Sequence, residues 1–392
     1  MIKDAVGREE NQNARVLIWS LRNVQNFVYN SCLFEFEDVI EETNESNVLA
    51  PPQYGAVGTF AKRVIEYKTR RTKAVSLSKV NPYLGSSIEL HYDYQIYFVV
   101  LDFPWYGASV NLLKNWRRRC RFAVCYVIEI WSADIPQMKN FMDFFNQFDL
   151  ICVGTYHVLD EVQAIAEVPC MFVLPGIDAL KFCPDLEGSE EDSRNIDVCS
   201  IGRGFPVTNQ KLLEKAQEDE SFFYYHELTN GSVLRVEDHQ AHRTLVSNIL
   251  KRSRYFVTNY AKANLPELIA GQHEIGYRFF EGAAAGSILI GAPPNAELFD
   301  RFFGWEDSII PTRLNEPDIV DIIEELDTQP KRIEKIRRNN VVNSLLQHDW
   351  IYRWEQILDR LGLPTTEEAE ARKQKLKQKA EALLPTAVTS SR

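Results

Sequence analysis

A single glutamate lies inside an otherwise apolar and small-residue stretch in the second half of the chain. The stretch reads YRFFEGAAAG over residues 277–286, with Glu281 at its centre. A buried carboxylate costs several kcal/mol, on the order of a few per unpaired charge, unless a partner satisfies it. Glu281 therefore either contacts a ligand, pairs with Arg278, or caps a neighbouring backbone.

Other candidate groups directly follow apolar runs that read as strands. Gly202 and Arg203 follow one such run, and Asp102 and Glu129 each follow another. A glycine allows a ligand to approach the backbone closely, and a forked guanidinium group suits phosphate oxygens. The two carboxylates could orient a hydroxyl group or act as a base. The structural alternative for Gly202 and Arg203 is a turn followed by a surface charge. For each of the two carboxylates it is capping of a nearby helix.

These residues need a fold that brings strand ends together. The apolar runs lie at 15–21, 97–101, 121–128, 150–153, 170–174, 196–201, 222–226, 255–259 and 287–290, with helix-like stretches between many of them. Nearly continuous apolar strands indicate parallel sheets covered on both faces, so we expect an α/β fold. Ligands of such sheets bind beyond the carboxyl ends of the strands, where Asp102, Glu129 and Arg203 are placed.

The length of 392 residues suits two domains, and an acidic, turn-rich connection at 185–195 separates two series of strands. We expect domains at 1–177 and 178–345, a helix at 346–362, and a polar tail at 363–392 that is helical or disordered. We interpret the tail as solvated or frayed, and a helix that binds a partner is the alternative.

Composition excludes several classes of protein. A net charge of −11 argues against a broad nucleic-acid surface. No segment approaches the roughly 18 to 20 apolar residues of a membrane span, and the polar N-terminus is unlike a secretory signal, so we expect a cytoplasmic protein. The seven cysteines are scattered without zinc-site spacing, which predicts a reduced compartment and no structural metal.

The stretch HEIGYRFFEGAAAGSILIG at 273–291 resembles the carboxyl half of retaining glycosyltransferases with two Rossmann-like domains, the GT-B architecture. It is most similar to the spore-maturation-protein-like branch, whose signature is Arg, two residues, Glu, then small residues and Gly. Glu281 matches the second glutamate of the family pattern Glu, seven residues, Glu, which holds the donor ribose. His273 occupies the first position, with Glu274 one residue out of register, and His273 could still donate to a sugar or phosphate oxygen.

Two further segments carry the same resemblance. Residues 174–184 look like the crossing between the two domains, and residues 347–353 resemble the start of the family's terminal helix. The resemblance extends from about 170 to 361, and Arg203 falls where the family places a phosphate-binding arginine. It implies that 1–177 is the acceptor domain, 178–345 the nucleotide-sugar donor domain, and 346–362 a helix crossing back to the first domain.

The resemblance implies a glycosyltransferase of hexosyltransferase type (EC 2.4) in polysaccharide or glycoconjugate biosynthesis. It would move a sugar from a nucleotide-sugar co-substrate to a hydroxyl of a glycan, lipid or small molecule, with retention, without metal and without another cofactor. The expected donor-binding residues are Gly202, Arg203, His273, Arg278, Glu281 and Gly282, and the expected catalytic residues are Glu129, Asp102 and Arg203.

In retaining transfer the departing phosphate can take the acceptor's proton, whereas an inverting variant would need Glu129, Asp102 or His157 as the base. A sugar-nucleotide epimerase or hydrolase and a non-catalytic nucleotide- or sugar-binding module are the alternatives. Basic clusters at 117–121 and 68–73 are solvated faces, or they bind an anionic acceptor or the inner face of a membrane.

Overall fold

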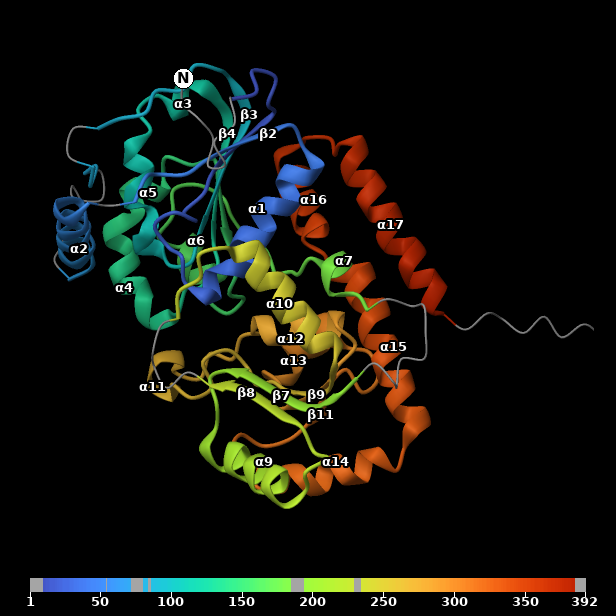
Figure 1. Cartoon of the computed structure of the whole chain (residues 1–392). Coiled ribbons are helices and arrows are strands. Elements are labelled where there is room, and N and C mark those ends of the chain that lie inside the picture. Colours follow the sequence, from blue (N-terminus) through green and yellow to red (C-terminus); the bar gives the residue numbers. More distant parts are fainter. Residues whose placement is uncertain are drawn as a thin grey trace, which may run out of the picture.

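The computed structural model describes residues 10–53, 55–71, 80–83, 86–184, 194–228 and 234–384. Most of the predicted connection at 185–195 and the last residues of the predicted tail lie outside these ranges. The described chain forms two parallel sheets with helices around and between them (Figure 1). The predicted α/β class is confirmed.

The first sheet has six strands in the order β2-β1-β3-β4-β5-β6, and each neighbouring pair is parallel. The strands are β1 Val16–Trp19, β2 Ser46–Leu49, β3 Tyr94–Leu101, β4 Cys120–Val127, β5 Leu150–Val153 and β6 Cys170–Phe172. Only β2 was not predicted, because its sequence SNVL is short and half polar. The central strands β3 and β4 are almost wholly buried, as their continuous apolar runs require.

The second sheet has five strands in the order β11-β10-β9-β7-β8, again with parallel neighbours. The strands are β7 Ile196–Gly202, β8 Tyr224–Leu228, β9 Ser253–Val257, β10 Ile288–Gly291 and β11 Ile310–Pro311. The two-residue strand β11 was not predicted, because so short a segment carries no periodic pattern. In each sheet, the carboxyl ends of all strands lie at the same edge because the strands are parallel.

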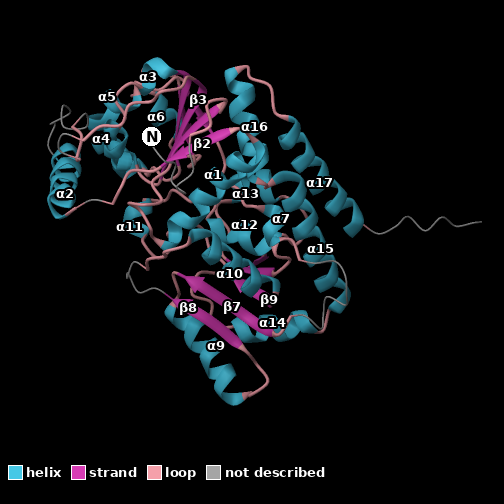
Figure 2. Ribbon diagram, turned by 45° about the horizontal axis from the view of Figure 1, so that its top comes forward, coloured by secondary structure: helices cyan, strands magenta, loops and turns pink. Residues whose placement is uncertain are grey.

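Helices of the first half cover the first sheet and include several single turns (Figure 2). They are η1 Val28–Asn30, α1 Ser31–Thr43, α2 Ala56–Arg71, η3 Pro104–Leu112, α3 Trp116–Arg119, η4 Ser132–Asp134, α4 Ile135–Met138, η5 Lys139–Phe141, α5 Met142–Phe145 and α6 Leu159–Gln163. The long helix α1 has buried residues along most of its length. It lies between the first sheet and the second half of the chain (Figure 1).

Helices of the second half surround the second sheet and return to the first. They are α7 Ala179–Phe182, α9 Pro206–Glu218, α10 His239–Lys251, α11 Pro266–Ile269, α12 Tyr277–Ala284, α13 Ala296–Phe303, α14 Ile319–Asp327, α15 Pro330–Gln347, α16 Trp350–Leu361 and α17 Glu367–Leu383. Local signals start and end them: Asp238 caps α10 by accepting from the amide of Ala241, and α16 ends at Gly362 in the left-handed conformation.

Helix α16 packs against the first sheet and its covering helix. The ring of Trp350 stacks on Phe36 of α1 with centroids 4.6 Å apart, and Trp354 meets the edge of Phe98 in β3 at 5.4 Å. One continuous apolar cluster therefore includes residues from both sheets. This contact is the one expected of a helix that crosses back to the first domain.

Helix α17 corrects the expectation of a solvated or frayed tail. Ala369, Leu376 and Ala380 are buried along one face, and the guanidinium group of Arg372 forms ion pairs with Asp178 at 2.7 Å and Asp349 at 2.8 Å. The apolar stripe is so sparse that sequence alone indicated solvent exposure. A buried cation paired with two carboxylates supplies the missing contact.

None of the described helices is long and apolar enough to cross a membrane.

Candidate functional site

The segment 258–276, between β9 and α12, joins the carboxyl ends of the two sheets. Gln272 donates through Nε2 to the carbonyl of Ile130 at 3.2 Å and accepts from the amide of Ser132 at 3.0 Å. The carboxylate of Glu274 accepts from the backbone amides of Tyr156 and His157, both at 3.0 Å. The loops that follow β4 and β5 are therefore held directly against the second half of the chain.

Lys262 of this segment reaches into the loops that follow β3 and β4. Its ammonium group forms an ion pair with Glu129 and lies over the rings of Phe103 and Trp131, 4.7 and 4.9 Å from their centroids. Its side chain is only 6% exposed, and its backbone is left-handed with φ of 53°. That conformation costs about 1–2 kcal/mol for a residue other than glycine, so the surrounding contacts must hold it.

Asp102 lies buried beside this ion pair. Burial and the nearby charge of Glu129 raise the pKa of Asp102 to about 8, although Lys262, Asn30 and Arg203 act in the opposite direction. Within the described residues, neither Oδ2 of Asp102 nor the side-chain amide of Asn30 has a hydrogen bond of ordinary geometry. Buried polar groups nearly always have partners, so this place suits a polar ligand or ordered water.

Glu281 belongs to a buried chain of charges that links both halves of the molecule. One of its oxygens accepts from Arg243 of α10, and the other accepts from Nη1 of Arg278 at 2.6 Å. Arg243 also donates through Nε to Glu35 of α1 at 2.8 Å, and Glu35 accepts from the amide of Asp178. Burial alone would raise the pKa of Glu281, but the two guanidinium groups outweigh it and lower that pKa. Of the alternatives left open by the sequence, pairing with Arg278 is the one present in the structure.

Arg278 and Arg203 lie at the carboxyl end of β7. A Cβ atom placed on Gly202 would lie 3.2 Å from Nη2 of Arg278, and Gly202 has a φ of 91°. Arg203 follows and is exposed. It lies close enough to Asp102 to lower the pKa of that carboxyl group. The cationic end of β7 and the carboxylates after β3 and β4 are therefore parts of one region.

Two of the predicted donor-binding residues, Gly282 and His273, have their contacts away from Arg203, Arg278 and Glu281. Gly282 faces the sheet, because a Cβ atom there would lie 2.4 Å from Leu289 and 2.6 Å from Phe256. Its lack of a side chain permits close packing of α12 on β9 and β10. His273 stacks on the ring of Tyr260 within the same segment, with centroids 4.1 Å apart. Neither residue joins the charge chain of Glu281.

His157 and two arginines of the basic cluster at 117–121 have acidic partners. Nδ1 of His157 lies 2.9 Å from Glu274, and this hydrogen bond raises the pKa of His157. Arg117 pairs with Asp149 at 2.6 Å, and Arg119 pairs with Asp93 at 2.9 Å. Of the second basic cluster, Lys73 lies outside the described residues.

Sequence reasoning missed Lys262, Arg243 and Glu35. Lys262 lies in the expected kind of loop, directly after a strand of the second sheet, but a loop lysine is usually a solvated charge. Arg243 and Glu35 lie on helices more than 200 residues apart, in a contact that no local spacing predicts. The one available signal was Glu281 itself, because a buried carboxylate requires a cation.

Comparison with known proteins agrees with this architecture. Residues 220–359 match a family model described as glycosyl transferase-like. No curated protein matches the sequence. Anabaena HepE in complex with UDP and glucose is similar at a TM-score of 0.50 and 12% identity, covering 89% of this chain and 100% of that one. An α-glucosyltransferase in complex with UDP and a 13-mer DNA is similar at a TM-score of 0.53 and 12% identity. The similarity covers 89% of this chain and 99% of that one.

These matches confirm the resemblance to GT-B glycosyltransferases that the sequence carried. The assignment to the spore-maturation-protein-like branch and the exact domain boundaries stay predictions. The chain has the GT-B fold, and over residues 220–359 it matches the glycosyl transferase-like family.

Proposed function

We propose that this chain transfers a sugar from a nucleotide-sugar donor to a hydroxyl group of a glycan, lipid or small molecule. The observation that carries the proposal is the buried meeting of Asp102, Glu129 and Lys262, supplied by loops at the carboxyl ends of both sheets. The loops beyond the carboxyl ends of the strands are where ligands of open parallel sheets bind.

On the donor side, Arg203 and Arg278 would hold the diphosphate. The guanidinium group of Arg278 lies beside Gly202 at the carboxyl end of β7, and Arg203 directly follows that strand. Negative charge develops on the departing nucleoside diphosphate, so fixed cations there stabilise the transition state more than the ground state. This supports transfer that depends on arginine side chains, and we propose that no metal is needed.

Glu281 would act on the donor side through Arg278. Both of its carboxylate oxygens accept from guanidinium groups and its side chain is only 3% exposed, so a contact with the donor ribose requires the surrounding side chains to move. In the described arrangement Glu281 fixes the orientation of Arg278 toward Gly202. We therefore propose Glu281 as a positioning residue of the donor site.

On the acceptor side, Asp102 would orient the reacting hydroxyl group. With a pKa of about 8, its carboxyl group is mostly protonated at neutral pH and can donate a hydrogen bond. Glu129, paired with Lys262, lies at the edge of this place. We propose retaining transfer, in which the departing phosphate takes the proton of the acceptor hydroxyl group.

A donor panel tests the proposal. Because the two similar structures contain UDP, UDP-sugars come first, followed by GDP-, ADP- and dTDP-sugars. A donor at one hundred times its dissociation constant should stabilise the fold by about 2.7 kcal/mol, which thermal unfolding detects. Release of nucleoside diphosphate is then measured with and without candidate acceptors. Release that does not depend on an acceptor would indicate a hydrolase or epimerase, and binding without release would indicate a binding module.

Variants assign the site. Lys262→Met and Arg203→Ala should each lower kcat/KM by about 100-fold or more, because each removes a fixed charge from the site. Lys211→Met is the matched control, since Lys211 is an exposed lysine of the second half and pairs with Glu214 on the same helix. Near-normal turnover in Lys262→Met and Arg203→Ala would reject the assignment. NMR of the anomeric product distinguishes retention from inversion, and activity in a chelator tests metal dependence.

A further inference from the structure

Helix α2 exposes an apolar face at the edge of the first domain. Val57, Phe60, Val64 and Tyr67 are 66%, 69%, 38% and 57% exposed. At 3.6 residues per turn these four positions fall within an arc of about 80°. Isolated exposed apolar residues are ordinary, but a continuous stripe on one helix marks an interaction surface.

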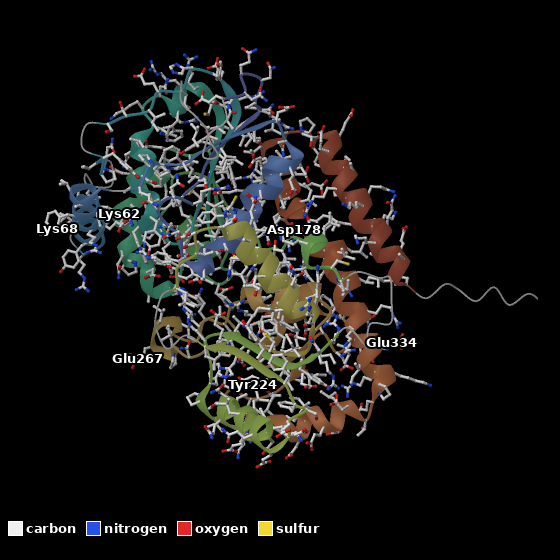
Figure 3. The ribbon with its side chains drawn as sticks, in the orientation of Figure 1. Lys62, Lys68, Asp178, Tyr224, Glu267 and Glu334 are labelled. Carbon is white, nitrogen blue, oxygen red and sulfur yellow. The ribbon has the colours of Figure 1, made fainter. Side chains whose placement is uncertain are left out.

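The opposite side of α2 fixes the helix to the rest of the molecule. Ile65 is buried, and Nζ of Lys62 lies 5.3 Å from the centre of the ring of Tyr106 in η3. The helix contacts η3, α4 and η5 and stands at the outer edge of the first domain, away from the second sheet (Figures 1 and 3). The apolar stripe is therefore held in place and faces outward.

Basic residues border the stripe. Residues 56–71 contain five basic residues and one acidic residue, Glu66, which pairs with Lys62 at 3.3 Å. On the helix, Arg63 and Lys68 lie at the two borders of the stripe, and Arg71 extends it at the carboxyl end; all three are exposed. This basic surface occurs on a chain whose net charge is −11, so its charge is local.

We propose that α2 docks this protein on an anionic lipid surface. Val57, Phe60, Val64 and Tyr67 would enter the boundary between headgroups and acyl chains, while Arg63, Lys68 and Arg71 would contact anionic headgroups. An apolar stripe bordered by basic residues is the pattern of helices that lie in this boundary.

The observations favour lipid over other occupants. A nucleic acid would satisfy the basic residues but leave the aliphatic and aromatic stripe in water. A second copy of the chain would bring two basic helices together, where like charges repel. Only a surface that is both apolar and anionic matches both features of α2. This inference is independent of the proposed transferase activity.

Flotation of the full chain with vesicles tests the inference. We expect binding to vesicles of phosphatidylcholine with one third phosphatidylglycerol, and little binding to pure phosphatidylcholine. Each basic residue near an anionic surface contributes about a fivefold increase in affinity, so Arg63→Gln/Lys68→Gln/Arg71→Gln should weaken binding on the order of 100-fold. Raising the salt to about 0.5 M should weaken binding in the same direction, because exposed charges are screened.

A matched control separates the place of the charges from their number. Lys331→Gln/Lys375→Gln/Lys377→Gln removes the same net charge from exposed positions on α15 and α17. It should bind the anionic vesicles within about threefold of the original chain, since its charges lie away from the docking surface. Equal weakening in both triple variants would overturn the inference, because net charge alone would then explain the binding.

The apolar stripe needs its own pair of variants. Val57→Ser/Phe60→Ser should weaken binding to anionic vesicles at least tenfold, whereas Phe223→Ser/Leu245→Ser, which changes exposed apolar residues elsewhere, should not. Thermal unfolding checks that each variant folds. Absence of flotation by the original chain would overturn the inference. A dimer in light scattering that is lost in Val57→Ser/Phe60→Ser would also overturn it, because the stripe would then bind a second copy.

Discussion

Replacing Arg243 tests why a carboxylate can be buried in α12. In the variant Arg243→Met, Glu281 and Glu35 lose a shared cation, although both remain buried. Breaking a buried ion pair costs about 3–5 kcal/mol. Glu281 keeps Arg278, and Glu35 keeps the amide of Asp178, so we expect a loss of about 3 kcal/mol, at the lower end of that range.

Urea unfolding followed by tryptophan fluorescence and by circular dichroism measures this loss. Coincidence of the two transitions is required, because two domains can unfold separately. The control Lys211→Met removes an exposed pair and should leave the unfolding free energy close to that of the original chain. A loss below about 1 kcal/mol in Arg243→Met would refute the reasoning.

A second variant distinguishes charge from packing. Neutralising both carboxylates, in Glu35→Gln/Arg243→Met/Glu281→Gln, removes the unpaired charges and should recover about half or more of the loss. If the triple variant is as unstable as Arg243→Met, the cost comes from packing around the longer arginine side chain. The ion pairs would then have little to do with how α12 is held.

Three further predictions concern single residues. The pKa of Asp102 rises from 3.8 to about 8 on folding, so between these values the folded chain keeps a proton that the unfolded chain loses, and stability falls as pH rises. Asp102→Asn should therefore raise the melting temperature at pH 8 and change it little at pH 4. An equal change of the melting temperature at both pH values would contradict this prediction. Gly282→Ala should cost about 1–3 kcal/mol in urea unfolding by overpacking α12 on the sheet, and a neutral result would contradict the contact distances. Gly202→Ala should raise the donor KM about tenfold or more by displacing Arg278, and an unchanged KM would remove Arg278 from the donor site.

Most of the fold could be predicted because its strands are buried on both faces. Residues 97–101 and 122–127 are apolar without interruption, and they lie in the central strands β3 and β4. Strand β2 escaped prediction because half of its four residues are polar, and β11 escaped because it has only two residues. The segment of α17 was predicted as a polar tail that is helical or disordered, and its packing was missed because Arg372 is read from the sequence as a solvated charge.

The candidate site was predicted in part. Asp102, Glu129 and Arg203 were identified from their positions after strands, and the structure places all three in one region. Gly282 was assigned to the donor from its place in a motif, whereas the structure places it against the sheet. A motif indicates that a glycine is needed, but the sequence does not show whether its missing side chain makes room for a ligand or for the sheet.

The sequence by itself determined the parallel sheets, the edge at which polar residues gather, and the need of Glu281 for a cation. Those properties follow from local periodicity and from the cost of burying a charge. Only the tertiary structure decided that the cations are Arg243 and Arg278, and that Lys262 reaches Glu129 across the two sheets. The reason is that these contacts join segments distant in the sequence. The identity of an arginine or lysine does not show whether its side chain is solvated or buried against a carboxylate.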